Sequence, residues 1–163
     1  WFKQNKVDIV VGTKNKNKIV DLILQHLKTK KSICKISDFK SNDKFENFDV
    51  FEHLDNTRAF LKIQDGCNFF CHYCLIPYCR GRQRSLEHNK VIKAVKYYVK
   101  KGYQEIVLTG VNTAGYIDGN YTFYNLLQDL DKLPGDFRIR ISSLEPFQID
   151  HKIIDLLANN PKR

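Results

Sequence analysis

The sequence predicts an α/β fold of parallel strands, either an open three-stranded sheet or the first half of a partial (β/α) barrel. Three short segments rich in β-branched and apolar residues read as strands, at residues 59–64, 105–109 and 137–141. Each is followed by a loop and then by a segment with helical periodicity, at residues 87–101, 123–132 and 150–158. Regular strand–helix alternation gives parallel strands with right-handed crossovers, and three units are too few to close a barrel.

A separate α/β unit precedes this region. Residues 7–12 form a β-branched run that ends at Gly12, which predicts a buried strand, and residues 15–28 carry apolar side chains at helical spacing. Residues 29–56 lose this periodicity and gain polar residues, as is typical of a linker. We therefore predict a boundary near residue 56, with the end of one domain in residues 1–56 and a second domain in residues 57–163.

Composition narrows the class of protein. The chain of 163 residues is 42% hydrophobic and 28% charged, which is typical of a globular protein. It contains no apolar run of the roughly 20 residues that span a bilayer and no secretion signal, so we expect a cytoplasmic protein. It contains no Met and begins with Trp1, and we expect a piece of a longer protein. The net charge of +9 favours a polyanionic partner such as RNA, although a lysine-rich surface also serves solubility.

The cysteines point to a metal site. There are five, and Cys67, Cys71, Cys74 and Cys79 lie within thirteen residues, an arrangement unlike a disulfide framework. Thiolates suit zinc or an iron–sulfur cluster, but a structural zinc site needs four ligands, often in two Cys-x2-Cys pairs. Three thiolates on a four-iron cluster instead leave one iron open to chelate S-adenosylmethionine. A fourth thiolate from Cys79 would close the site; we expect Cys79 to be a non-ligand and Cys34 to be a reduced thiol.

The Cys-x3-Cys-x2-Cys spacing, with Tyr73 just before the last cysteine, resembles the signature of the radical S-adenosylmethionine superfamily. Further segments are similar to its methylthiotransferase family, at residues 60–67, 76–82, 105–112 and 138–146. Residues 11–16 look like the last part of that family's N-terminal domain. The "LTGVN" and "RISSLEP" segments resemble the branch that acts on threonylcarbamoyladenosine in tRNA. Cys79 departs from the small residue usual in the family.

The resemblance implies methylthiolation of N6-threonylcarbamoyladenosine beside the tRNA anticodon, with S-adenosylmethionine as methyl donor and radical source. It implies a 4Fe-4S cluster on Cys67, Cys71 and Cys74, and a second 4Fe-4S cluster in an N-terminal region outside this sequence. We expect tRNA and an electron donor of the flavodoxin or ferredoxin type as partners, with no membrane and no DNA. This piece alone is expected to be inactive. Two alternatives remain open, a ribosomal-protein methylthiotransferase and a non-catalytic metal-binding module.

The remaining site candidates follow the predicted strands. By resemblance, Tyr73 lies beside the adenine of S-adenosylmethionine, and Gly110 and Asn112 contact its amino-acid end. Ser143 and Glu145 face the cofactor or substrate, or merely cap a helix. Three arginines beside the cysteines are candidates for RNA phosphates or for pairing with local carboxylates, namely Arg80, Arg82 and Arg84.

Overall fold

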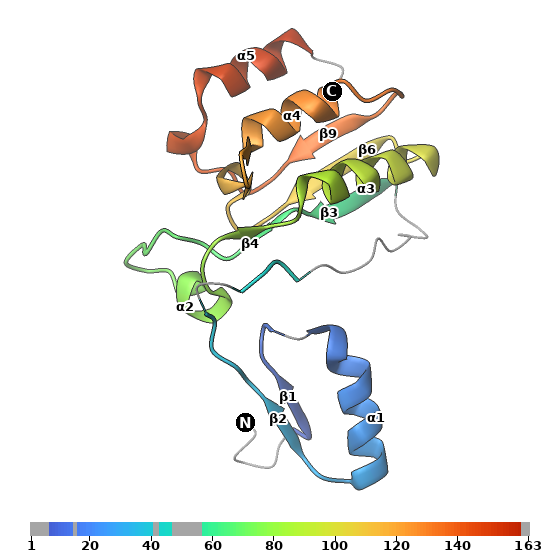
Figure 1. Cartoon of the computed structure of the whole chain (residues 1–163), viewed down its shortest axis with the longest axis vertical. Helices are drawn as coiled ribbons and strands as arrows, with labels where there is room; N and C mark the ends of the chain where they lie inside the picture. Colours follow the sequence, from blue (N-terminus) through green and yellow to red (C-terminus); the bar gives the residue numbers. More distant parts are fainter. Residues whose placement is uncertain (1–6, 15, 41–42, 47–56, 161–163) are drawn as a thin grey trace.

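The computed structural model describes residues 7–14, 16–40, 43–46 and 57–160, in two parts that follow each other along the chain (Figure 1). The smaller N-terminal unit pairs two strands next to one helix. The larger C-terminal unit holds a three-stranded sheet and three longer helices. The predicted boundary near residue 56 lies outside the described residues.

The N-terminal unit is a strand–helix–strand motif. It consists of β1 (Ile9–Val11), a 3-10 turn η2 (Lys16–Lys18), α1 (Ile19–Thr29) and β2 (Ile33–Lys35). The two strands pair in parallel with Val10 opposite Cys34. The predicted strand and helix are present, but β2 lies inside the segment interpreted as a linker. With only three residues it is too short to show an alternating pattern, and its pairing with β1 defines it.

The C-terminal sheet has the predicted parallel order. Its strands are β3 (Arg58–Lys62), β6 (Glu105–Thr109) and β9 (Arg138–Ile141), with β6 in the centre. The register places Glu105 between Arg58 and Arg138 at the amino ends of the strands. All three carboxyl ends therefore meet at one edge of the sheet, which is where parallel α/β folds carry their functional loops.

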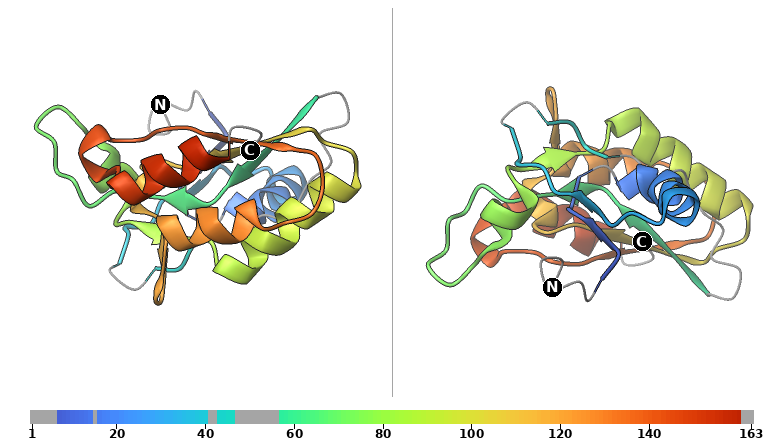
Figure 2. Two further views of the ribbon diagram at one scale, coloured as in Figure 1. Left: turned by 90° about the horizontal axis from the view of Figure 1, so that it is seen from above. Right: turned by 90° about the horizontal axis from the view of Figure 1, so that it is seen from below.

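Three helices pack in sequence order, α3 (His88–Lys100) beside α4 (Phe123–Asp131) and α4 beside α5 (His151–Asn159) (Figures 1 and 2). Alternate strand residues and inward helix residues form one core, which includes Leu61, Ile106, Leu108, Val91, Val95, Leu126 and Leu130. The opposite face of the sheet carries no helix among the described residues, and Phe60 there is exposed. One-sided cover by helices is the layering of an open or partial barrel.

Helix ends follow local chemistry. Gly102, with φ +88°, terminates α3 as predicted, because glycine adopts this left-handed conformation without strain. Thr122 and Asn125 form a capping box at the start of α4. The Asp150 side chain caps α5 by accepting from the Lys152 N–H.

Short elements that the sequence pattern does not predict shape the carboxyl edge. They are β4 (Gln64–Asp65), α2 (Ile76–Arg80), β5 (Arg84–Ser85), η3 (Thr113–Gly115), β7 (Ile117–Asp118), β8 (Tyr121–Thr122) and η4 (Pro146–Gln148). β4 and β5 pair antiparallel and close the base of the loop that carries the cysteines. Across the described ranges, no helix combines the length and apolarity that crossing a bilayer requires.

Candidate cofactor site

Three loops meet at the carboxyl edge of the sheet. We call them the cysteine loop (residues 66–83), the Asn112 loop (residues 110–116) and the Ser143 loop (residues 142–148). The Thr113 N–H donates to the Ser143 carbonyl at 3.0 Å, which joins the second loop to the third. The rings of Phe69 and Phe147 meet edge to face at 5.2 Å, which joins the first to the third. The structure thus brings the three predicted segments together.

The cysteine loop is closed by its own backbone. The Cys67 N–H donates to the Gly81 carbonyl at 3.1 Å, and the Gln83 N–H donates to Asn68 Oδ1 at 3.1 Å. Gly66 has φ +70°, and a Cβ there would collide with the carbonyl groups of Arg82 and Gly81. Only glycine allows the two ends of the loop to approach this closely.

The three predicted ligands all lie within this loop as free thiols. Cys67 is buried, Cys74 is half-buried and Cys71 is exposed. The Phe69 N–H donates to the Cys67 sulfur at 3.4 Å, which holds this sulfur against the backbone of the loop. The Cys74 N–H donates to the Cys71 carbonyl at 2.9 Å, so a tight turn joins the second and third ligands.

The three thiols are the type of ligand that an iron–sulfur cluster binds. Within residues 7–14, 16–40, 43–46 and 57–160, no three His, Cys, Asp or Glu side chains converge on a point that would hold a single ion. In a cluster each thiolate binds a different iron, so its ligands surround a larger group than one ion. Soft thiolates on a partly exposed loop are the ligands such a cluster takes.

Cys79 lies apart from the other loop cysteines in local structure. It belongs to α2, its side chain is exposed, and its backbone carbonyl accepts from the Thr13 hydroxyl at 2.7 Å. This bond links the N-terminal unit directly to the cysteine loop. That Cys79 is a non-ligand stays a prediction.

Aromatic residues surround the loop. Phe70 meets Tyr78 edge to face at 5.4 Å, and the Arg82 guanidinium lies over the Phe70 ring at 4.4 Å. Tyr73 is 90% exposed, so its ring is open to a neighbouring group. That Tyr73 lies beside an adenine stays a prediction.

A buried carboxylate ties the two ends of the cysteine loop together. Asp65 accepts from the Lys62 ammonium at 2.6 Å, from the Arg84 guanidinium at 3.1 Å and from the Gly66 N–H at 2.9 Å. Burial raises the pKa of Asp65, but the hydrogen bond and charge of Lys62, the Gly66 N–H and Arg84 together outweigh it, so its pKa lies below the ordinary value. The carboxylate is therefore charged at neutral pH.

The three arginines have different environments. Arg84 is largely buried, and beyond Asp65 it donates to the carbonyl groups of Arg80 at 2.6 Å and Arg82 at 3.0 Å. Arg80 is half-exposed with its guanidinium 3.7 Å from Asp65. Pairing with a local carboxylate thus describes Arg84 and, more loosely, Arg80. Arg82 is exposed on the loop surface and remains the candidate best placed for phosphate.

The Asn112 loop contains unpaired buried polar groups. Asn112 is only 2% exposed, yet neither atom of its side-chain amide has a hydrogen-bond partner in the described part of the chain. The hydroxyl of Thr113 is in the same state. Leaving such groups unsatisfied costs about 1–3 kcal/mol each, so this position calls for a further partner, either an ordered water or a bound molecule. That Asn112 contacts the cofactor stays a prediction.

The other two loop candidates have exposed side chains. Ser143 adopts φ +58°, and its contribution to the loop is the carbonyl that receives the Thr113 N–H. The Glu145 carbonyl accepts from the Gln148 N–H at 3.0 Å and so begins η4, with its carboxylate open to solvent. Both stay predictions as cofactor or substrate contacts.

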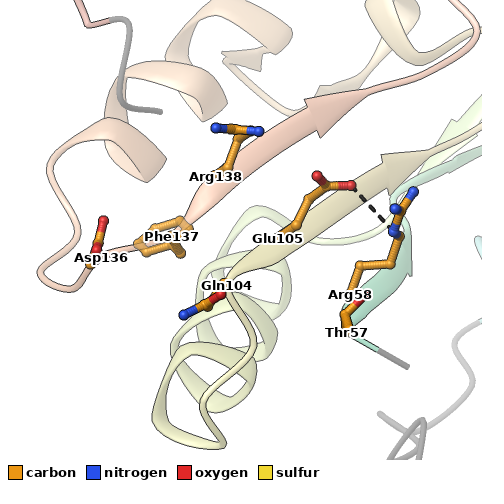
Figure 3. Close-up of a pocket in the computed structure, with 7 residues that line it drawn as sticks. All are labelled: Thr57, Arg58, Gln104, Glu105, Asp136, Phe137 and Arg138. Carbon is orange, nitrogen blue, oxygen red and sulfur yellow. Dashed lines mark ion pairs between the residues drawn. The ribbon is translucent and has the colours of Figure 1, made fainter. Parts of the chain in front are cut away.

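An open pocket lies away from these loops (Figure 3). It has a volume of about 360 Å³ and lies at the amino ends of the three strands, with Arg58 and Glu105 paired at 3.5 Å on its wall. Its side chains come from the edge of the sheet opposite to the cysteines. It contains none of the predicted site residues.

Sequence reasoning missed two residues that build the site, Gln64 and Asp65. Both are buried polar residues that directly follow an apolar strand and precede Gly66. That position was the available signal, because a polar pair at the end of a buried strand needs partners.

Comparison with known proteins places the chain in a superfamily. The model of the Radical SAM superfamily matches residues 61–163, and the chain belongs to that superfamily. Among solved structures, the radical S-adenosylmethionine methyltransferase TsrM of Kitasatospora setae superposes with a TM-score of 0.51 at 19% identity, over 61% of this chain and 18% of TsrM. This likeness concerns the fold, and it confirms the predicted α/β class.

Curated relatives are more similar in sequence. The threonylcarbamoyladenosine tRNA methylthiotransferase MtaB of Bacillus subtilis is 43% identical over 159 residues, which are 96% of this chain and 35% of the relative. The MtaB protein of Aquifex aeolicus is 34% identical, over 98% of this chain and 39% of the relative. A tRNA-2-methylthio-N(6)-dimethylallyladenosine synthase of Lachnoclostridium phytofermentans is 36% identical, over 96% and 34%. The chain spans about a third of the length of these relatives.

The buried carboxylate yields a prediction. Asp65→Asn keeps an acceptor for the Gly66 N–H but removes the charge that Lys62 and Arg84 share, so we expect a loss of about 3 kcal/mol in the free energy of unfolding. Urea denaturation at neutral pH measures this loss. Because the folded pKa lies below the unfolded value of about 3.9, the stabilisation is fully present above that pH and is lost as pH falls through the folded pKa.

The variant should therefore lack this part of the acid sensitivity. Asp155→Asn, at an exposed position on α5, is the matched control and should change stability by less than about 0.5 kcal/mol. Equal urea midpoints for the two variants would show that the network does not stabilise the loop.

Proposed function

We propose that this chain is the part of a radical enzyme that binds a 4Fe-4S cluster and S-adenosylmethionine, with Cys67, Cys71 and Cys74 as cluster ligands. The observation that carries the proposal is the arrangement of the site. Three free thiols lie on one loop at the carboxyl edge of a parallel sheet, next to the buried and unpaired amide of Asn112. Membership of the Radical SAM superfamily supports both cofactors.

The residues of this chain bind and orient the cofactor. Bound on the three thiolates, the cluster supplies the electron for reductive cleavage of the sulfonium of S-adenosylmethionine. Asn112 has both a donor and an acceptor without a partner in the described part of the chain, and these would bind the carboxylate and amino groups beside Gly110. The exposed ring of Tyr73 would pack on the adenine. Ser143 and Glu145 would contact the cofactor or the substrate from the third loop.

We infer that the reaction is methylthiolation of N6-threonylcarbamoyladenosine in tRNA, in the cytoplasm. The names and identities of the MtaB relatives support this substrate over a ribosomal protein. The inference extends to the whole protein, with a second 4Fe-4S cluster in an N-terminal region beyond this sequence and an electron donor of the flavodoxin or ferredoxin type. We also propose the domain boundary near residue 56, between the β1–β2 sheet and the β3–β6–β9 sheet.

The cluster assignment predicts unequal effects of the four loop cysteines. In the full-length protein, Cys67→Ala, Cys71→Ala and Cys74→Ala should each lower iron and sulfide content after anaerobic reconstitution by one cluster. Cys79→Ala should leave both unchanged, because Cys79 lies outside the Cys-x3-Cys-x2-Cys spacing, on the short helix α2. Loss of a cluster from the Cys79 variant would instead support a closed, four-thiolate site.

The substrate assignment predicts a change in cellular tRNA. Deleting the gene should abolish the methylthio form of N6-threonylcarbamoyladenosine and leave the unmethylthiolated nucleoside, as mass spectrometry of digested tRNA measures. The unsubstituted gene should restore it and a Cys71→Ala gene should not, since the thiolate is a proposed ligand. If the methylthio nucleoside persists in the deletion strain, the assigned substrate is wrong.

The arginines predict a specific salt dependence of tRNA binding. Arg82→Ala should weaken binding more at low salt than at high salt and reduce the logarithmic salt slope by about 1, because an exposed arginine on a phosphate displaces counterions. Filter binding over a salt series measures this slope. Arg138→Ala, an exposed arginine at the opposite edge of the sheet, is the control. Equal slopes for both variants would remove Arg82 from the RNA interface.

A further inference from the structure

Gln64 connects two of the three loops through one side chain. Its Oε1 accepts from the Val111 N–H at 2.9 Å and from the Asn112 N–H at 2.8 Å. Its Nε2 donates to the Asp65 carbonyl at 3.1 Å and to the Gly66 carbonyl at 2.7 Å. One end of the amide thus holds the Asn112 loop, and the other end holds the residue that precedes Cys67.

All four hydrogen-bonding positions of this amide are used. A carboxamide offers two acceptor lone pairs and two donor hydrogens, and each of them has a backbone partner here. Gln64 is 0% exposed, and polar interactions are stronger in such a low-dielectric surrounding. The side chain is therefore fixed in position, and a shift of either loop breaks bonds to the other.

Gly110 leaves room for the side-chain amide of Gln64. A Cβ on Gly110 would lie 2.8 Å from Gln64 Oε1 and 3.0 Å from the Gln64 Cβ. Glycine at position 110 thus allows the second strand to end against the amide. This gives Gly110 a role in addition to its predicted contact with the cofactor.

We propose that Gln64 is a positioning residue that couples the seat of the cluster to the cofactor-binding loop. Its hydrogen bonds go to backbone groups, and they hold the backbone beside the Cys67 thiol and beside the Asn112 amide. Binding of the cluster to the cysteine loop therefore makes the Asn112 loop more rigid. Binding of S-adenosylmethionine at Asn112 depends on this rigidity. The inference rests on the proposed function of the site.

Substitution by glutamate separates the two ends of the amide. Gln64→Glu keeps an oxygen for the N–H groups of Val111 and Asn112, but it places a second carboxylate oxygen against the carbonyl groups of Asp65 and Gly66. Burial raises the pKa of such a carboxyl, and its neutral form regains one donor. The defect should therefore be largest at high pH and lessen as pH falls.

The test measures binding of S-adenosylmethionine by equilibrium dialysis to full-length protein with a reconstituted cluster. We expect Gln64→Glu to raise the dissociation constant by about 10–100-fold at pH about 8 and by less at pH about 6. Effects of this size are typical when a residue that orients the ligating residues is substituted. Gln128→Glu is the matched control, because among the described residues the Gln128 side chain bonds only to Tyr124, on the same helix α4. It should bind as tightly as the unsubstituted protein at both pH values.

A second measurement needs no variant. Hydrogen–deuterium exchange of residues 108–116 in the unsubstituted protein should slow when the cluster is loaded, before any S-adenosylmethionine is added. Equal exchange with and without the cluster would overturn the coupling, and so would unchanged binding by Gln64→Glu. If the unsubstituted protein takes up no cluster on Cys67, Cys71 and Cys74, the proposed function itself fails.

Discussion

The Asp65 carboxylate lies where the two ends of the cysteine loop meet, and the geometry of the site depends on the ion pairs it makes. Between Gly66 and Gln83 the chain contains only one helix of five residues, so little regular structure supports the thiols from within. Lys62 approaches the carboxylate from the incoming strand and Arg84 from the outgoing one. The two ends of the loop are thus held together mainly by ion pairs to Asp65. In a longer hairpin, backbone hydrogen bonds between the strands would do this.

The remaining contacts extend this base into a three-loop assembly. Gln64 joins the cysteine loop to the Asn112 loop, and the bond from the Thr113 N–H to the Ser143 carbonyl joins that loop to the next. Each connection involves backbone groups, so the side chains of Asn112 and Ser143 stay free for other partners. The sheet fixes the distance between the loops, and the hydrogen bonds fix their orientation.

The sequence predicted the regular elements and much of the chemistry. Residues 105–109 form a strand with the predicted bounds, because a β-branched run between a polar segment and a glycine has few alternatives. The elements β2, β4, β5 and α2 escaped prediction since two to five residues carry no periodicity and tertiary pairing defines them. Spacing alone indicated Cys67, Cys71 and Cys74. It did not separate Arg82 from Arg84, because the partner of Arg84 lies nineteen residues earlier in the chain.

The ring of Phe39 lies against Gly81 and beneath the Arg84 guanidinium, at 4.7 Å from its centre. Phe39 belongs to the segment that leads from the N-terminal unit toward the sheet, and that segment therefore forms a floor under the end of the cysteine loop. A segment that packs against the cysteine loop in this way is more than a flexible linker. Its length from β2 to Phe39 is limited by geometry, so insertions there are expected to be selected against even though the local sequence is polar and irregular.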